Sequence, residues 1–262
     1  MPTSLTQILD TTRRDLPGLI ARRGELERAA ERAPTPPSFR TALGSGRLAL
    51  IAEVKRRSPS AGVIRADLHP AERARAYSSA GASAISVLTD GPFFGGSLDD
   101  LRAVARDVPV PVLRKDFILD EAQIAEARAA GAAAVLLIVR ALEAPRLRAL
   151  LAYARDLGLE ALVEVHTRAE LDTALGADAA IVGVNSRDLD SFRIDVASAW
   201  ELIARVPADR IAIAESGMHS VDDVERAAQA GADGVLIGTA LSAATEPGAL
   251  ARAFAEVPRR GR

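Results

Sequence analysis

The chain repeats one pattern along its length: a short apolar run that ends in polar residues, followed by a stretch with helical spacing. Eight such runs begin at or near Leu48, Ala82, Pro109, Ala132, Leu159, Ala179, Arg210 and Asp233. Their Val, Ile, Leu and Ala residues are continuous rather than alternating, which is typical of parallel strands buried on both faces. Parallel strands in this number, each followed by a helix, form a closed (β/α)8 barrel. The sequence therefore predicts an α/β fold of the TIM-barrel class.

An extension precedes the first apolar run. Apolar residues recur in it at helical spacing, at Leu5, Ile8, Leu9, Leu16, Leu19 and Ile20. Pro17 is expected to begin a second helix or to kink the first, and prolines from Pro34 onward end it. We expect an N-terminal helical extension over residues 1–46 and a single catalytic barrel domain over residues 47–262. The helix is expected to pack over one end of the barrel, and an independent partner-binding arm is the alternative.

The composition excludes several partners and chemistries. The net charge is −2 with both signs interspersed, so neither a nucleic acid nor an anionic membrane is an expected partner. The chain has no cysteine, which excludes disulfides, thiolate nucleophiles and zinc–sulfur sites. The first residues lack the apolar core of a secretory signal, and no window approaches a membrane span. We expect a cytoplasmic location and leave protein partners open.

Small residues follow the seventh and eighth predicted strands. Barrels commonly bind phosphate there, through backbone N–H groups and the N-terminus of a short helix. In this chain the two loops contain Glu215, Ser216 and Gly217, and then Gly238 and Thr239. These residues let the backbone approach an anion, which favours a phosphorylated small-molecule substrate. Ordinary tight turns are the alternative.

Phenylalanine is placed unusually in this sequence. Phe93 and Phe94 follow the second predicted strand, Phe117 follows the third and Phe192 the sixth. Four of the six phenylalanines thus fall in loops at the catalytic face, although such bulky side chains normally fill a core. Their placement indicates either an aryl group in the ligand or a hydrophobic lid over the barrel.

Ionisable side chains gather at the ends of three predicted strands. Glu53 and Lys55 end the first strand and point the same way, because side chains alternate in direction along a strand. Lys115 and Glu164 end the third and fifth strands, across the barrel mouth. Burial of such groups together shifts their pKa values and suits general acid–base catalysis near neutral pH. Buried structural ion pairs are the alternative, and the placement of all four at strand ends favours catalysis.

The histidines and glycines indicate neither a metal nor a cofactor. His69, His166 and His219 lie in separate loops without the spacing of metal ligands, and no carboxylate cluster resembles a divalent-ion site. His166 lies nearest to the predicted site, two residues beyond Glu164, but no histidine is expected to be catalytic. Neither a glycine-rich dinucleotide fingerprint nor a P-loop is present. We expect no metal and no organic cofactor.

Seven segments in register resemble one enzyme family. The most specific are IAEVKRRSPSAGVI, residues 51–64, and VLTDGPFFGGSLDDL, residues 87–101. PVLRKDFILDEAQI, LVEVH, VGVNSRDL, IAESGM and GVLIGTAL follow in the family's order. From about Ile8 to the last helix, the chain resembles the indole-3-glycerol phosphate synthases, TIM-barrel lyases that form the indole ring in tryptophan biosynthesis.

The resemblance implies a reaction and its proton-transfer residues. The substrate would be 1-(2-carboxyphenylamino)-1-deoxyribulose 5-phosphate, which loses carbon dioxide and water as its pyrrole ring closes. Lys115 would be the acid that activates the ketone, and Glu164 a base in the later proton transfers. Glu53 and Lys55 would assist dehydration and hold the anionic ligand. Which lysine protonates the departing hydroxyl stays open.

The resemblance also implies a set of binding residues. Asn185 and Arg187 would support the region where the ring closes, and Ser58 would lie near the substrate carboxylate. Phe94 and Phe117 would contact the aryl group. Beside these, Glu215 would line the site, and the phosphate would be bound by Ser216, Gly217, Gly238 and Thr239.

Three positions depart from the family pattern. Asn is usual where Ser186 stands, Ser or Glu where Thr239 stands, and an acid where His69 stands; none of the three is a proton-transfer residue. Two other classes are alternatives: a phosphosugar isomerase such as phosphoribosylanthranilate isomerase, and a catalytically silent barrel that binds a phosphorylated metabolite. The Glu53–Lys55 pair together with Lys115 argues against the isomerase, and the intact set of ionisable strand ends argues against the silent barrel.

Overall fold

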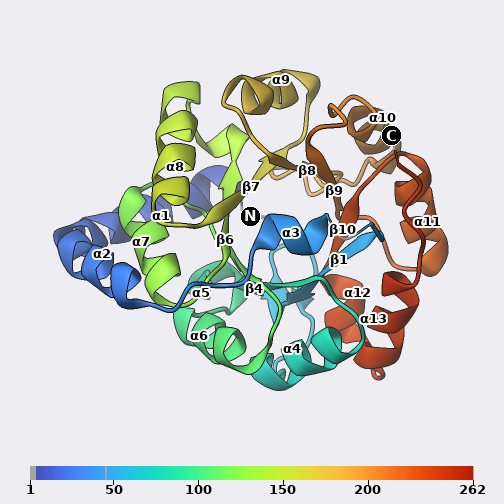
Figure 1. The fold of residues 1–262 in the computed structure, drawn as a ribbon, viewed down its shortest axis with the longest axis horizontal. Coiled ribbons are helices and arrows are strands. Elements are labelled where there is room, and N and C mark those ends of the chain that lie inside the picture. The colour runs from blue at the N-terminus through green and yellow to red at the C-terminus, as the bar shows by residue number, and fades with distance from the viewer. Residues whose placement is uncertain (1–3, 45, 262) are drawn as a thin grey trace.

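The computed structural model describes residues 4–44 and 46–261. Within these ranges, eight parallel strands close into a barrel in the order β1-β10-β9-β8-β7-β6-β5-β4, and helices surround it (Figure 1). The strands are β1 (Ala49–Val54), β4 (Ala84–Leu88), β5 (Val112–Lys115), β6 (Ala134–Ile138), β7 (Glu160–Val165), β8 (Ile181–Asn185), β9 (Ile211–Glu215) and β10 (Gly234–Ile237). Each predicted apolar run contains one of these strands, so the prediction of a TIM barrel is confirmed.

Helices follow the strands and cover the outside of the barrel. They are α4 (Pro70–Ser79), α6 (Leu98–Asp107), α7 (Glu121–Ala129), α8 (Ala144–Asp156), α9 (Arg168–Gly176), α10 (Val196–Ile203), α11 (Val221–Gln229) and α13 (Pro247–Ala255). Shorter elements follow some strands directly: the hairpin β2 (Arg57–Ser58) and β3 (Gly62–Val63), α5 (Gly91–Phe94), the 3-10 turn η1 (Val139–Ala141) and α12 (Thr239–Ala243). None of the described helices is long and apolar enough to cross a membrane.

Local capping fixes where several outer helices begin. Asp120 accepts a hydrogen bond from the N–H of Ala122, and Gln123 bonds back to complete a capping box at the start of α7. Ser220 and Asp223 form the same arrangement at the start of α11. These caps satisfy backbone N–H groups that the first helical turn leaves unpaired. The two helices therefore begin at fixed residues shortly after β5 and β9.

The strands separate two apolar cores. Leu50, Ile85 and Val135 pack outward against the helices, whereas Ile51 and Leu113 pack inside the barrel. Because successive side chains on a strand point to opposite faces, neighbours such as Leu50 and Ile51 belong to different cores. Both faces of each strand are buried, and this explains why the apolar runs of the sequence do not alternate.

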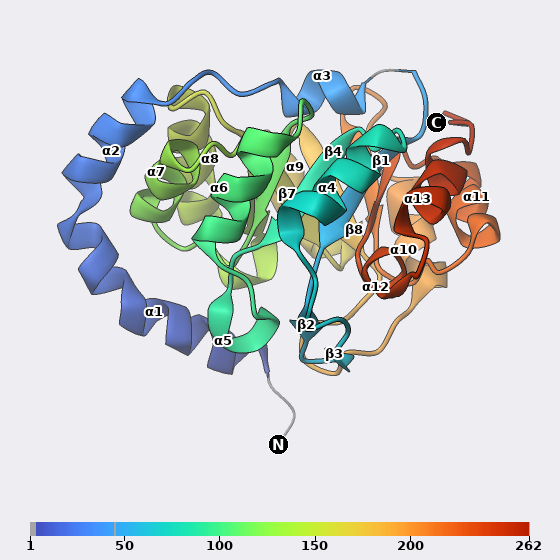
Figure 2. The ribbon, with the colours of Figure 1, turned by 90° about the horizontal axis from the view of Figure 1, so that it is seen from below.

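The described residues before β1 form α1 (Leu5–Ala21), α2 (Arg23–Arg32) and α3 (Phe39–Leu43). The first helix continues through Pro17, and the second begins at Arg23 rather than at that proline. Figure 2 shows that α1 and α3 lie at opposite ends of the barrel, and that α2 connects them along its side beside α7. The extension thus runs the full height of the barrel.

Both ends of the extension bury apolar side chains against the barrel. Leu5 and Ile8 of α1 belong to the same apolar cluster as Phe94, which follows β4 at the end where the strands terminate. Phe39 and Leu43 of α3 are fully buried at the other end. The prediction that the helix packs over one barrel end was incomplete, because the residues before β1 cover both.

Candidate active site

The predicted site residues lie at the carboxyl ends of the strands, around two adjoining hollows. The first hollow is lined by Glu53, Lys55, Ser58, Phe94, Lys115, Phe117, Glu164, Asn185, Arg187 and Ser216. The second shares several of these residues and adds Glu215, Gly217, Gly238 and Thr239. The structure therefore brings together all the residues that the sequence singled out as a site.

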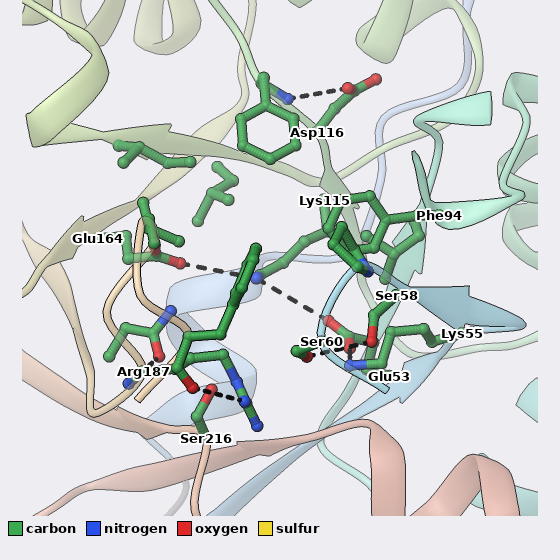
Figure 3. Close-up of a pocket in the computed structure, with 18 residues that line it drawn as sticks. Glu53, Lys55, Ser58, Ser60, Phe94, Lys115, Asp116, Glu164, Arg187 and Ser216 are labelled. Carbon is green, nitrogen blue, oxygen red and sulfur yellow. Dashed lines mark hydrogen bonds and ion pairs between the residues drawn. The ribbon is translucent and has the colours of Figure 1, made fainter. Parts of the chain in front are cut away.

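Lys115 lies at the centre of the ionisable groups (Figure 3). Its Nζ is 3.5 Å from Glu215 Oε2, 3.6 Å from Glu164 Oε2 and 4.0 Å from Glu53 Oε2. These carboxyls come from β9, β7 and β1, and each is at most 3% exposed. A single ammonium group thus faces three buried carboxyl groups from three sides of the barrel.

This arrangement shifts the pKa values of both kinds of group. Burial alone would lower the pKa of Lys115, but the carboxylates of Glu164, Glu215 and Glu53 outweigh it and raise that pKa above its ordinary value. Burial and the neighbouring Glu164 raise the pKa of Glu215 well above the ordinary range of a glutamate. The cluster therefore favours the ammonium form of Lys115 and disfavours ionisation of Glu215, because one ammonium group cannot compensate three carboxylates at once.

Glu53 and Lys55 form a close ion pair beside this cluster. Lys55 Nζ lies 2.8 Å from Glu53 Oε1, and burial of Glu53 is outweighed by Lys55 and Lys115, so the pKa of Glu53 is lowered. The hydroxyl of buried Ser242, on α12, accepts a hydrogen bond from the Lys55 N–H and donates one to the Glu53 carbonyl, both at 3.2 Å. A Cβ atom at Gly238 would collide with Glu53 Oε1 and lie 2.9 Å from Lys55 Nζ. The end of β1 is thus held from behind by α12.

The second hollow has the features of an anion site. Ser216 and Gly217 both have a left-handed backbone, with φ of 66° and 75°. A Cβ atom at Gly217 would lie 2.5 Å from Val196 Cγ1 and 3.1 Å from Ser186 Oγ, so only glycine fits this turn without displacement. Lys55 and Arg187 line the same hollow and add positive charge. Backbone of small residues with two nearby cations is suited to bind a phosphate group.

The first hollow has an apolar wall. The rings of Phe94 and Phe117 are tilted by 39°, with their centroids 6.0 Å apart. Leu136 and Ile138, two residues apart on β6, line the same hollow, as does Phe192. Three of the four loop phenylalanines therefore contribute to the site, whereas Phe93 packs in the apolar cluster that includes α1. The wall can hold a flat aromatic group.

Polar side chains complete the first hollow. Asn185 Oδ1 accepts a hydrogen bond from the N–H of Arg187 at 3.0 Å, and the Arg187 guanidinium donates to the Phe192 carbonyl at 3.2 Å. Burial lowers the pKa of Arg187, yet a guanidinium stays charged at neutral pH. Ser58 is buried, and its hydroxyl accepts from the N–H of Ala61. These contacts orient polar groups at the mouth of the site.

Some site features were missed in the sequence. Leu136 and Ile138 could have been predicted from the sequence. Residues two apart on a strand point to the same side, so near the carboxyl end of a barrel strand both can point into the barrel mouth. Ser242 had no sequence signal, since its role depends on how α12 folds back onto β1. His69 and His219 are exposed, whereas the side chain of His166 is only 4% exposed and lies beside Glu164. Within residues 4–44 and 46–261, no group of His, Asp and Glu side chains is arranged to hold a metal ion.

Solved structures of low sequence identity share the fold. A 3-hexulose-6-phosphate synthase from Salmonella typhimurium is 17% identical, with a TM-score of 0.64 over 80% of this chain and 98% of its own. A thiamine phosphate pyrophosphorylase from Pyrococcus furiosus is also 17% identical, with a TM-score of 0.61 over 81% of this chain and 96% of its own. At this level of identity, the similarity supports the barrel architecture alone.

Sequence comparisons identify the family. A family model described as indole-3-glycerol phosphate synthase matches residues 5–254. The indole-3-glycerol phosphate synthase of Opitutus terrae is 47% identical over 264 residues, which cover 97% of this chain and 99% of that protein. Indole-3-glycerol phosphate synthase 2 of Streptomyces coelicolor is 50% identical over 224 residues, covering 86% and 87%. The chain therefore belongs to the indole-3-glycerol phosphate synthase family, as its motifs predicted.

Proposed function

We propose that this chain converts 1-(2-carboxyphenylamino)-1-deoxyribulose 5-phosphate to indole-3-glycerol phosphate, carbon dioxide and water, a carboxy-lyase reaction of tryptophan biosynthesis. The observation that carries the proposal is the position of Lys115, whose ammonium group lies among three buried carboxyls. An apolar wall lies on one side of this cluster and a hollow of small residues on the other. This order matches the aryl ring, the ketone and the phosphate along the substrate. Family membership supports the same reaction.

The chemistry requires both acids and a base. The ring carbon that bears the carboxylate attacks the ketone carbon, and the ketone oxygen takes up a proton. The carboxylate then leaves as carbon dioxide, which restores the aromatic ring. The new hydroxyl takes up a second proton and leaves as water, while a base removes a proton from the carbon beside the nitrogen. One proton is therefore taken up from solution in each turnover.

Lys115 is suited to act as the acid in ring closure. The surrounding carboxylates favour its ammonium form, and its Nζ lines both hollows, where the ketone would lie between aryl and phosphate groups. As the ketone oxygen gains negative charge, an ammonium group held in place by the protein stabilises it more strongly than water does. The three carboxyls fix the ammonium group in place, so little reorganisation is needed during attack.

Glu164 and the Glu53–Lys55 pair are suited to the dehydration. Glu164 is buried on β7 and faces Lys115, so as a carboxylate it can take the proton from the carbon beside the nitrogen. Lys55 lines both hollows and can protonate the departing hydroxyl, with Glu53 as its counter-ion at 2.8 Å. Lys115 is the second candidate for the donor of that proton. Comparing single substitutions of the two lysines on the hydroxylated intermediate separates these assignments.

The remaining residues orient the substrate. The phosphate would bind over Gly217 and Gly238, with Ser216 and Thr239 beside it and Lys55 and Arg187 supplying positive charge. The aryl ring would lie on the wall that includes Phe94, Phe117, Leu136 and Ile138, with its carboxylate toward Ser58. Asn185 would act through Arg187, whose N–H bonds to it. Fixing the substrate at both ends brings its two reacting carbons together, which lowers the entropic part of the barrier.

One assay tests the proposed function. Purified protein is incubated with the anilino-deoxyribulose phosphate, and indole absorbance and carbon dioxide are followed together. Equal amounts of both products are expected, and Lys115→Met is the matched inactive control. Isomerisation of a phosphosugar without carbon dioxide release, or binding without turnover, would instead support one of the two alternative barrel classes. We further propose a cytoplasmic location, supported by membership of a biosynthetic enzyme family. The net charge of −2 supports the absence of a nucleic-acid partner.

A further inference from the structure

His166 has an almost fully enclosed side chain that the proposed mechanism leaves unused. It follows β7 directly, and its side chain is 4% exposed. Its Nε2 lies 3.5 Å from Glu164 Oε1, and its Nδ1 lies 3.2 Å from Glu170 Oε2. The imidazole therefore lies between two carboxyl groups, one inside the site and the other on α9.

The contacts with Glu170 determine whether the imidazole nitrogen that faces Glu164 carries a hydrogen. One oxygen of Glu170 accepts a hydrogen bond from the His166 backbone N–H at 2.6 Å and lies 3.2 Å from Nδ1. An ionised carboxylate can only accept, so Nδ1 carries a hydrogen. In a neutral imidazole Nε2 then bears a lone pair, which faces the lone pairs of Glu164. Among the described residues, Nε2 has no other hydrogen-bond partner, so its contact with Glu164 becomes a hydrogen bond only when a proton lies between the two groups.

Glu170 is held ready to balance a charged imidazole. Burial opposes its ionisation, but hydrogen bonds from His166 and the charge of Arg140 lower the pKa of Glu170. Arg140, on η1, lies 3.1 Å from Glu170 and 2.8 Å from Asp188 in the loop after β8. The side chain of Asp188 is 40% exposed, so this line of charged groups reaches from Glu164 to solvent. Lys115 of β5 faces Glu164 from the inner side.

We propose that His166 is a positioning residue that shares one proton with Glu164 during turnover. When Glu164 accepts a proton from the substrate carbon, that proton moves from the Glu164 oxygen to Nε2. Glu164 is then a carboxylate again, and the imidazolium lies against the carboxylate of Glu170. The reverse transfer returns the proton, so only one O–H and one N–H bond change. This inference rests on the proposed function, because it takes Glu164 as a base.

A purely structural role would make use of different contacts. Thr167 caps α9, and Glu170 at the third helical position reaches back to the His166 backbone N–H. This is the geometry that begins a helix, and it depends on the backbone of residue 166 rather than on its ring. An asparagine at this position keeps the backbone contact and places an amide N–H where Nδ1 lies. It lacks Nε2, and therefore separates the two roles.

The kinetic test compares His166→Asn and His166→Gln with wild type. The asparagine keeps a hydrogen-bond donor toward Glu170, and the glutamine keeps one toward Glu164. Neither amide can take up or release a proton. We expect kcat to fall by about tenfold or more in both, with KM nearly unchanged, since a proton-transfer partner acts after binding. His69→Asn, at an exposed histidine outside the site, is the matched control with wild-type rates.

Turnover at the wild-type rate across the pH range in either folded variant overturns the proposal. The proposal is also overturned if His166→Asn lowers the melting temperature enough for unfolding alone to explain its whole loss of activity. Thermal unfolding of each variant, measured at the assay pH, therefore accompanies the kinetics.

A nuclear magnetic resonance measurement tests the shared proton without any turnover. The chain has three histidines, and exposed His69 and His219 serve as internal references. When the pair takes up a proton as the pH is lowered, the 15N shift of His166 Nε2 should become that of a nitrogen sharing a proton. Glu164→Gln should remove this change, while at each pH the reference signals match those of wild type. An unchanged His166 signal overturns the proposal. If the signal changes but the anilino-deoxyribulose phosphate is not converted, proton sharing is supported and the proposed function fails separately.

Discussion

Lys115 Nζ lies 3.5 Å from Glu215 Oε2, although β5 and β9 are four strands apart in the closed ring. Strands so placed lie on opposite sides of the barrel, so the two side chains meet near its axis. Glu53 and Glu164 come from another opposite pair, β1 and β7. The barrel thus concentrates charge where its walls converge, and the pKa shifts of Lys115 and Glu215 follow from that geometry.

Lys115→Met tests the role of the central ammonium group. We expect kcat/KM to fall at least roughly 100-fold, because general acid catalysis is typically worth about 10² to 10⁴ in rate. The carboxyls also lose their cation, so the variant should be destabilised more at pH 8 than at pH 5, where they can take up protons. Steady-state kinetics and denaturant unfolding at both pH values measure this. A folded variant with normal turnover would move the acid role to Lys55.

Glu215→Gln tests the raised pKa of the carboxyl group. The folded chain holds a proton on Glu215 that the unfolded chain releases near pH 4.5, since burial and Glu164 raise the pKa only in the folded state. The free energy of unfolding should therefore fall as pH rises from about 4.5 toward the raised folded pKa. Glutamine stays neutral and removes this contribution, so the variant should lose less stability with rising pH. Identical pH dependence in variant and wild type would refute an uncharged Glu215.

The barrel and the members of its site could be predicted from sequence for simple reasons. Continuous apolar runs require burial on both faces, and the carboxyl ends of parallel strands lie at one edge. Residues that end strands, such as Lys115 and Glu164, must therefore gather at the same mouth. The motifs then related those positions to a known chemistry.

Contacts that depend on barrel closure or on packing behind a strand could not be predicted. Ser242 holds the end of β1 only because α12 folds back onto it. The proximity of His166 to both Glu164 and Glu170 depends on the turn between β7 and α9. Placement of α3 under the barrel depends on the length and path of the chain after α2, which apolar spacing does not specify. These features are set by tertiary structure rather than by local pattern.

Gly238→Ala tests the close approach between the phosphate hollow and the Glu53–Lys55 pair. A Cβ atom there would displace both side chains, so we expect a higher KM together with a lower kcat. Gly176→Ala, where the added Cβ meets no atom within 4 Å, is the matched control and should leave both constants unchanged. Affinity for a phosphorylated product analogue, measured by calorimetry, separates binding from chemistry. Normal affinity and turnover in Gly238→Ala would show that the pair tolerates displacement.

Ile8→Ala tests whether α1 contributes to the site, and Ile20→Ala on the same helix is its control. Ile8 is 3% exposed and packs in the cluster that includes Phe94, whereas Ile20 is 45% exposed. Truncating a buried isoleucine to alanine typically lowers the free energy of unfolding by about 2 to 5 kcal/mol. A surface substitution typically changes it by no more than about 0.5 kcal/mol. Because the cluster borders the wall proposed for the aryl ring, Ile8→Ala should also raise KM, by roughly threefold or more for an interaction of about 0.7 kcal/mol. Denaturant unfolding and steady-state kinetics of both variants measure these two effects. If Ile8→Ala loses stability but keeps its KM, Ile8 acts in folding alone and α1 does not support substrate binding through this residue.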